Sequence, residues 1–363
     1  MDPIKLEWLV LNRKSTDLAG HWAERVFQWG VRNRLIDGYP DGTFKPNQTV
    51  TEAEFLKMLY RAYGAVLPVQ SGENWTEGPY RLAAMWNHPA LGSVDREARM
   101  KPITRTKVAE LTASVAGYHY NGKQAIRFAL GRSISSGRTS ATIEGFVGEA
   151  QLTRAEAVQW IRKMKLQGIL SIKQRQKAPS DESLLPELPM NAEQAVQDFV
   201  LKPISDGGLS FIDTARGNGF EIGDSRSDLE RIYGTADDYD MFGRQHYGAL
   251  SIHYDEQGAV DAWGVNLGEG EVTSIRTAQG IEPGKSLLPE LLAVYGSAGY
   301  EGNEFATYLY EKKDDRFVPR SSPYEVENTD QAYVLSFIVD SLSLKVWYVS
   351  VSTFRFAYLM KFE

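Results

Sequence analysis

Residues 37–46 read Asp-Gly-Tyr-Pro-Asp-Gly-Thr-Phe-Lys-Pro, and Thr-Glu-Ala-Glu-Phe follows at 51–55. Gly38 stands where the left-handed residue after a helix belongs, and Asp41-Gly42 is a tight-turn signal. Thr51, with Glu54 three residues later, has the pattern of a capping box that begins a helix. The stretch therefore predicts an ordered turn followed directly by a helix.

A first helix is expected in front of this turn. Trp22, Val26, Phe27 and Val31 recur at the spacing of one helix face, and Asp17 is a candidate cap for that helix. Together with the second helix, which continues through Phe55 and Met58, they predict a unit of helix, ordered turn and helix.

The same unit returns twice. Thr153 follows Phe146 by seven residues, as Thr51 follows Phe44, and Thr104 begins a corresponding helix between them. Internal repeats of helix pairs generally stack around one shared core. We therefore predict an all-α domain over residues 1–172, with repeats at about 15–64, 72–116 and 117–170.

Three kinds of motif occur over residues 15–170, namely His21-Trp-Ala, Gly38-Tyr-Pro-Asp-Gly-Thr-Phe44, and the Thr-Arg helix starts at Thr104 and Thr153. With these motifs the stretch resembles the S-layer homology (SLH) domain, which normally occurs as three tandem repeats. The resemblance implies a pseudo-threefold SLH trimer, formed by three repeats of one chain, in which the grooves between repeats bind an anionic, pyruvylated secondary cell wall polysaccharide. That function implies an extracellular protein held noncovalently at the cell wall or S-layer.

Arginine at the first turn of a helix adds a guanidinium fork to free N–H groups, which suits a carboxylate. Glycines let sugar rings approach the backbone, and aromatic rings stack on apolar sugar faces, although each aromatic side chain is also a candidate core residue. The expected polysaccharide-binding residues are Arg105, Lys107, Arg138, Arg154, Trp22, Gly38, Tyr39, Trp75 and Gly137. Glu52 replaces the motif arginine in the first unit, and Lys107 replaces the motif glutamate in the second. At most one or two working grooves are therefore expected.

The charge of the chain changes sign along its length. Residues 1–180 hold 26 Lys+Arg and 16 Asp+Glu, and residues 181–363 hold 14 and 31, which together give the net charge of −7. A basic half favours an anionic partner such as nucleic acid, acidic glycan or a phospholipid surface, although a solvated surface explains it equally well. Attraction between the two halves is a third explanation. Nucleic acid is the least favoured partner, because it would leave the motif glycines and Thr-Arg starts unexplained.

Composition limits the remaining classes. The chain has no cysteine, which excludes disulfides and thiolate metal sites. No stretch approaches the roughly 20 apolar residues of a membrane helix, and no membrane span is expected. The short apolar run at residues 8–11 is too short for a signal-peptide core, so an export signal is expected to lie outside this sequence.

A polar and proline-punctuated segment at 173–190 predicts an interdomain linker. Beyond it, Ser225 to Gly234 and Ser286 to Gly296 each predict a serine-capped helix that ends in Tyr-Gly, followed by two strands. The acidic part, 191–363, is therefore expected to be a duplicated α+β domain with antiparallel sheets, its copies at about 191–275 and 276–363. An insertion of about 24 residues is expected in the second copy, near 312–330. The module distantly resembles tandem helix-plus-sheet modules of bacterial envelope proteins, which bind proteins.

Catalysis is not indicated. His246, His253 and Asp255 lie close in sequence, but no nucleophile or third metal ligand accompanies them, and no phosphate loop or dinucleotide fingerprint occurs. The leading hypothesis is a noncatalytic wall anchor without cofactor or metal, in which the acidic half contacts a protein partner. The alternative is a wall-associated enzyme whose acidic half acts on cell wall glycan or peptide.

Overall fold

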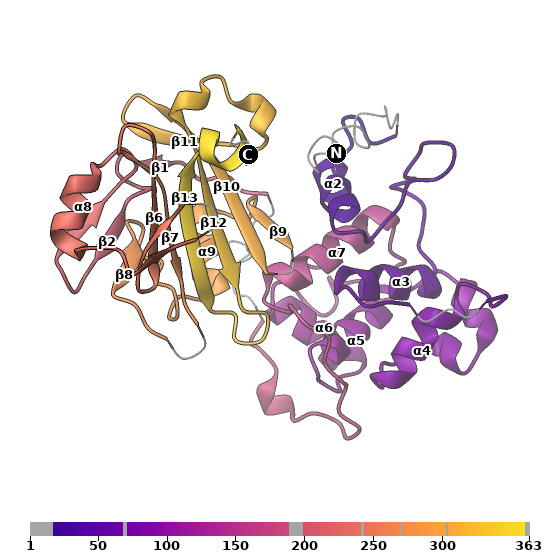
Figure 1. The fold of residues 1–363 in the computed structure, drawn as a ribbon. Coiled ribbons are helices and arrows are strands. Elements are labelled where there is room, and N and C mark those ends of the chain that lie inside the picture. Colours follow the sequence, from indigo (N-terminus) through magenta and orange to yellow (C-terminus); the bar gives the residue numbers. More distant parts are fainter. Residues whose placement is uncertain are drawn as a thin grey trace. The chain divides into compact units, whose positions relative to one another are not determined.

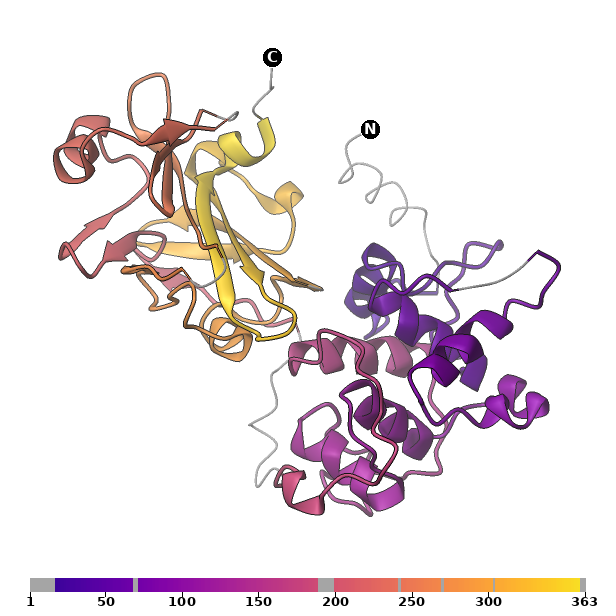
Figure 2. The same cartoon turned by 60° about the horizontal axis from the view of Figure 1, so that its bottom comes forward.

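The computed structural model describes residues 17–67, 71–188, 199–240, 243–268, 271–302 and 304–359. The chain divides into two compact units, Met1–Val196 and Gln197–Glu363. The first unit is helical and the second contains a large antiparallel sheet (Figures 1 and 2). The predicted multidomain organisation, with helices first and antiparallel strands second, is confirmed.

Three helices of the first unit begin where the capping threonines predict. Each threonine hydroxyl accepts the N–H of the residue three positions later, over 3.2 Å at Thr51 and Thr153 and 3.3 Å at Thr104. Thr51 and Thr153 complete capping boxes with Glu54 and Glu156, which satisfies a further N–H at each helix start. The α-helices of this unit are α2 (Glu24–Arg32), α3 (Glu52–Ala62), α4 (Glu77–Met85), α5 (Arg105–Val115), α6 (Gly122–Gly131) and α7 (Arg154–Leu166). Short 3₁₀ helices are η1 (Leu91–Ser93), η2 (Arg96–Met100) and η3 (Glu182–Leu184).

The segments in front of α3, α5 and α7 join in a closed cycle of backbone hydrogen bonds. Val50 donates its N–H to Leu152 (3.0 Å), Leu152 donates to Ile103 (3.4 Å), and Ile103 donates to Val50 (2.9 Å). The side chains of these three residues are buried. The cycle brings the three helix starts together, so the first side chain of one of these helices reaches the segment in front of another.

Asp17 has a different role from the predicted helix cap. Its carboxylate accepts the N–H groups of Phe44 (3.0 Å) and Lys45 (2.7 Å), 27 and 28 residues away. Helix α2 begins later, at Glu24. Asp17 therefore supplies an acceptor to the N–H groups of Phe44 and Lys45, at the end of the 37–46 turn where Lys45 has a positive φ of 50°.

The described part of the expected linker, 173–188, packs along the helical unit instead of forming a free tether. Lys173 donates its N–H to Val115, and Arg175 donates to Trp86. Ser180 donates its N–H to His119 and is itself buried, and Leu185 is also buried. Paired backbone groups and buried side chains hold this segment against the helices. Its polar composition predicted a free linker, because the contacts that hold it are made with residues distant in sequence.

The second unit contains a ten-stranded antiparallel sheet in the order β1-β11-β10-β12-β13-β7-β6-β5-β4, with β9 paired to β10, and a three-stranded sheet in the order β3-β2-β8. The strands are β1 (Ile204–Ser205), β2 (Phe211–Asp213), β3 (Asn218–Phe220), β4 (Asp238–Tyr239), β5 (Gln245–Tyr247), β6 (Leu250–Tyr254), β7 (Val260–Asn266), β8 (Ile275–Thr277), β9 (Tyr300–Gly302), β10 (Phe305–Lys313), β11 (Arg316–Arg320), β12 (Ala332–Val339) and β13 (Val346–Thr353). The helices are α8 (Arg226–Tyr233), α9 (Leu288–Tyr295), the 3₁₀ helices η5 (Pro323–Glu325) and η6 (Thr329–Gln331), and the π-helix η7 (Arg355–Leu359).

Equivalent contacts recur in the two halves of this unit. Gly223 donates its N–H to Val260 and Gly284 donates to Val346, each over 2.7 Å. A register shift at His253/Tyr254 between β6 and β7 has a counterpart at Ile338/Val339 between β12 and β13. The segment between β10 and β12, which holds β11, η5 and η6, lies where the sequence predicts an insertion.

Two details of the second unit differ from expectation. Strands β7 and β13 pair in register around Gly264 and Ser350, so the two expected sheets are joined into one. Helix α9 has Leu287 at its N-cap position, and the hydroxyl of Ser286 instead accepts the N–H of Glu282. Sheet joining depends on pairing between residues more than 80 positions apart, which local patterns do not encode.

Candidate functional site

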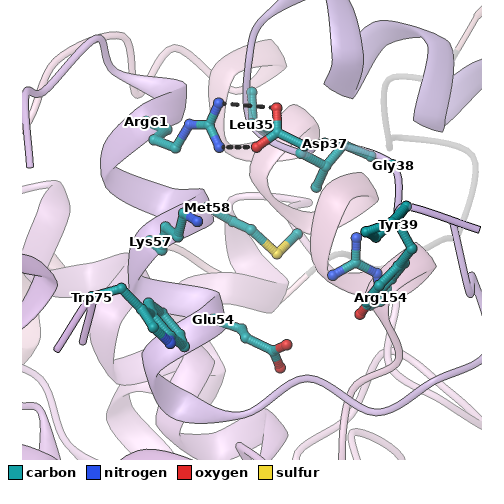
Figure 3. A pocket seen from close by; sticks show the side chains of 12 residues that line it. Leu35, Asp37, Gly38, Tyr39, Glu54, Lys57, Met58, Arg61, Trp75 and Arg154 are labelled. Carbon is teal, nitrogen blue, oxygen red and sulfur yellow. Dashed lines mark hydrogen bonds and ion pairs between the residues drawn. The ribbon is translucent and has the colours of Figure 1, made fainter.

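A pocket of about 210 Å³ opens between residues 35–40, one face of α3, and the start of α7 (Figure 3). Its lining residues are Leu35, Ile36, Asp37, Gly38, Tyr39, Pro40, Glu54, Lys57, Met58, Arg61, Trp75 and Arg154. Four of the predicted binding residues are thereby brought together, namely Gly38, Tyr39, Trp75 and Arg154. We call this the Arg154 pocket.

Arg154 is the first residue of α7, and its side chain reaches the turn at residues 37–46. Its Nε donates to the carbonyl of Phe44 over 2.9 Å, and its guanidinium carbon lies 5.0 Å from the centre of the Tyr39 ring. The residue is 7% exposed. Among the described residues, its terminal nitrogens have no hydrogen-bond partner, and Figure 3 shows the guanidinium beside Tyr39 in the lining. The Phe44 contact fixes the side chain and leaves the terminal donors available to a ligand.

Helix α3 contributes residues to the pocket that the sequence interpretation missed. Glu54, Lys57, Met58 and Arg61 are spaced i, i+3, i+4 and i+7 and therefore share one face of the helix. This periodicity was visible in the sequence, but only the tertiary structure shows that this face lines a pocket. Lys57 Nζ lies 5.4 Å from the centre of the Trp75 ring, so a cation and an aromatic face stand together.

The lining carries more positive than negative groups. Arg61 donates to both oxygens of Asp37, over 2.7 and 3.4 Å. This hydrogen bonding lowers the pKa of Asp37, and the positive charges of Lys57 and Arg154 act in the same direction. Glu54 accepts the Thr51 N–H over 2.8 Å as part of the helix cap. Because both carboxylates are engaged by protein groups, Lys57 and Arg154 remain to attract an anion.

Arg105 occupies the corresponding position at the start of α5 but is held more completely. Its Nε donates to the carbonyl of Phe146 over 2.8 Å, and a terminal nitrogen donates to Ser135 Oγ over 3.1 Å. The Gly137 N–H also donates to Ser135 Oγ, over 3.1 Å. In the Arg154 pocket the residue that corresponds to Ser135 is Ile36, which has no hydroxyl. Burial lowers the pKa of Arg105.

The other predicted residues lie outside the Arg154 pocket. The Lys107 ammonium is 2.5 Å from a carboxylate oxygen of Glu110, so it is not a free cation. Arg138 is exposed in the segment between α6 and α7. Trp22 is 56% exposed, and its ring centre lies 5.6 Å from that of His21. In the second unit His253 contacts Asp261 over 2.5 Å rather than Asp255, whose carboxylate instead accepts the N–H groups of a turn.

Comparison with known proteins identifies an S-layer homology domain over residues 16–56 of this chain. That match includes the turn and the first residues of α3. Two similar proteins come from Acetivibrio thermocellus. Cell surface glycoprotein 1 is 51% identical over 45 residues, which is 12% of this chain and 2% of that protein. The Cellulosome-anchoring protein is 35% identical over 52 residues, which is 14% of this chain and 12% of that protein.

The similarity to these proteins is thus confined to a short segment of each. Across the described residues, none of the helices has the length and apolar character needed to span a membrane. Both relatives carry names of surface or anchoring proteins, and the matched residues span only 2% and 12% of their lengths.

Proposed function

We propose that the helical unit anchors the protein noncovalently to the bacterial cell wall by binding an anionic, pyruvylated secondary cell wall polysaccharide in the Arg154 pocket. The observation that carries this proposal is the position of Arg154, whose terminal nitrogens line a pocket beside Lys57, Tyr39 and Trp75. Two cations suit a carboxylate, and two aromatic rings suit the apolar faces of sugars.

The proposal includes three SLH repeats, at about 15–64, 72–116 and 117–170, arranged with pseudo-threefold symmetry. The closed cycle through Val50, Ile103 and Leu152 supports this arrangement, because each repeat donates and accepts one equivalent backbone hydrogen bond. The arginines of the second and third repeats also make the same Nε contact with a turn carbonyl, at Phe146 and Phe44. The Arg154 pocket is the favoured site, because Ser135 holds Arg105 in the corresponding groove.

The acidic part of the chain, 191–363, is proposed to be a noncatalytic interaction domain built from two copies of an α+β module. The recurring contacts of Gly223 and Gly284, and the matching register shifts in the β6–β7 and β12–β13 pairs, support the duplication. A protein partner is proposed for this domain. Incubation of the full chain with peptidoglycan is expected to release no soluble fragments, and turnover would favour the enzymatic alternative.

Wall binding tests the anchoring proposal directly. The full-length protein is sedimented with purified cell walls before and after mild acid removes ketal-linked pyruvate. We expect co-sedimentation with untreated walls and its loss after depyruvylation, because the carboxylate that faces Arg154 is then absent. Retained binding after depyruvylation would contradict the carboxylate mechanism, and failure to sediment with untreated walls would contradict anchoring altogether.

A further inference from the structure

The first residues of α3, α5 and α7 occupy equivalent positions but differ in charge. Arg105 and Arg154 each donate Nε to a carbonyl in the turn of a neighbouring unit. Glu52, the first residue of α3, also crosses to a neighbouring turn, but as an acceptor. The contact at the start of α3 therefore has the reverse polarity, because a carboxylate stands where the other two helices begin with a guanidinium.

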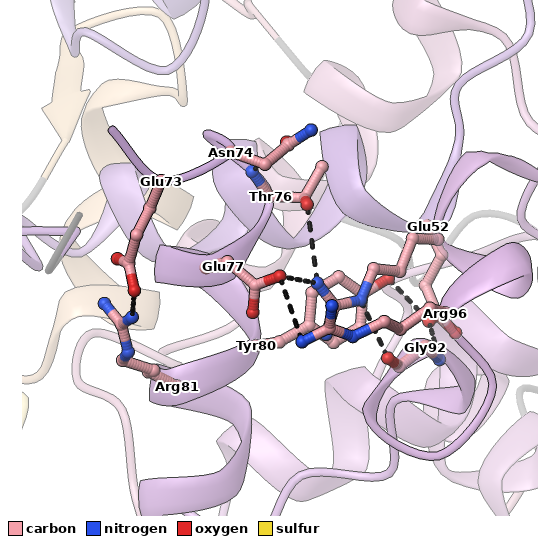
Figure 4. Close-up of polar contacts among 10 residues, drawn as sticks. Glu52, Glu73, Asn74, Thr76, Glu77, Tyr80, Arg81, Gly92 and Arg96 are labelled. Atoms are coloured by element: carbon pink, nitrogen blue, oxygen red, sulfur yellow. Dashed lines mark hydrogen bonds and ion pairs between the residues drawn. The ribbon is translucent and has the colours of Figure 1, made fainter. Parts of the chain in front are cut away.

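Three donors converge on the Glu52 carboxylate, and Figure 4 shows two of them, Tyr80 and Gly92. One oxygen accepts the Gly92 N–H over 2.7 Å and the Tyr80 hydroxyl over 2.8 Å, and the other accepts the Leu91 N–H over 2.9 Å. Glu52 is only 2% exposed. The carboxylate is thus buried and held by three hydrogen-bond donors, as the carboxylate of a bound ligand would be, but it belongs to the same chain.

The surroundings of this carboxylate are also suited to an anion. Burial raises the pKa of Tyr80, and the Glu52 charge adds to that effect, so the hydroxyl stays protonated and donates. The Arg99 guanidinium lies 4.3 Å from the centre of the Tyr80 ring, and its Nε donates to the Gly92 carbonyl over 2.9 Å. Gly92 is required because a Cβ there would lie 2.5 Å from the Tyr80 hydroxyl oxygen.

We propose that Tyr80 and the segment with Leu91 and Gly92 form a carboxylate-binding site, and that Glu52 occupies it as an internal ligand. Glu52 thereby closes this site to external anions and holds the start of α3 against Leu91 and Gly92. The inference depends only on these contacts, and it stands whether or not the Arg154 pocket binds polysaccharide. It predicts that the site accepts a free carboxylate once the Glu52 side chain is truncated.

Chemical rescue of Glu52→Ala in the full-length protein tests the proposal, with acetate as the probe and chloride at equal ionic strength as the reference. Amide hydrogen exchange is measured on peptides that cover residues 88–94. We expect faster exchange in the variant, and a saturable slowing by acetate that chloride does not reproduce. Adding Tyr80→Phe to Glu52→Ala should raise the half-saturating acetate concentration about tenfold, because one donor to the anion is lost.

Glu54→Ala is the matched control, because it removes a carboxylate from the same helical turn. The Glu54 carboxylate accepts from Thr51, whereas that of Glu52 accepts from the 88–94 segment. Acetate should not slow exchange at 88–94 in this control or in the wild-type protein. The proposal is overturned if acetate slows exchange in Glu52→Ala no more than chloride does. It is also overturned if acetate slows exchange equally in Glu52→Ala, Glu54→Ala and the wild-type protein.

A second variant covers the case in which Glu52→Ala does not fold. Glu52→Gln fills the same space without charge, and should increase exchange at Leu91 and Gly92 about tenfold, because a neutral acceptor binds these N–H groups more weakly. Exchange in α7 should be unchanged. Wild-type exchange rates at Leu91 and Gly92 in Glu52→Gln would contradict the proposal.

Discussion

Replacing Arg154 with glutamine should separate ligand binding from structural support. The substitution removes the two terminal guanidinium nitrogens of a pocket-lining residue, together with the Nε contact to the Phe44 carbonyl. A hydrogen bond from a charged donor contributes about 1.5–3 kcal/mol, so wall binding should weaken by about 10- to 150-fold. The assay is depletion of soluble protein by increasing amounts of purified wall, with thermal unfolding followed in parallel.

Arg105→Gln is the matched control for this prediction. It loses the equivalent Nε contact to Phe146 and also the Ser135 contact, so its loss of stability should be at least as large. Its wall binding should change by less than about threefold, because its donors are already engaged by the protein. Equal loss of wall binding in the two variants, or a larger loss in Arg105→Gln, would refute the assignment of the site to the Arg154 pocket.

Three further results are expected. Lys57→Gln should weaken wall binding about fivefold with little change in unfolding temperature, since Lys57 forms no ion pair within the described residues and contributes about 1 kcal/mol of attraction at the pocket. Burial lowers the pKa of His88 to about 4, so the unfolded state takes up the proton at a higher pH than the folded state. The free energy of unfolding should therefore fall by about 3 kcal/mol as the pH is lowered from 7 to 4. Urea unfolding should show that His88→Gln flattens this dependence, and an unchanged slope would contradict it. Thr153→Ala should cost about 1 kcal/mol of stability in the same assay, because the N-cap hydroxyl is lost, whereas Thr139→Ala on the exposed turn should cost less.

The first residues of α3, α5 and α7 differ in the contacts that their side chains make. Equivalent backbone contacts surround Glu52, Arg105 and Arg154, yet the three side chains are respectively an internal ligand, a braced cation and a cation whose terminal donors line a pocket. The role of the first side chain of these helices therefore depends on its own charge and on its partner in the facing segment. Ile36 and Ser135 illustrate the dependence on the partner.

The amino-acid sequence by itself determined the features that depend on neighbours within a few residues. The caps at Thr51, Thr104 and Thr153 and the turn at 37–46 follow from hydrogen bonds that close over three or four positions. The split between a helical first part and a strand-rich second part follows from hydrophobic period, which changes from helical spacing to alternation.

Only the tertiary structure decided which of these elements meet. Arg154 reaches Phe44 across 110 positions, and Glu52 reaches Leu91 across 39, because the backbone cycle places each helix start against another unit's turn. The same holds for the face of α3 that lines the pocket and for the β7–β13 pairing that joins the sheet. Contacts at such separations depend on how whole units pack, so local sequence signals name the candidate residues while packing determines which of them share a site.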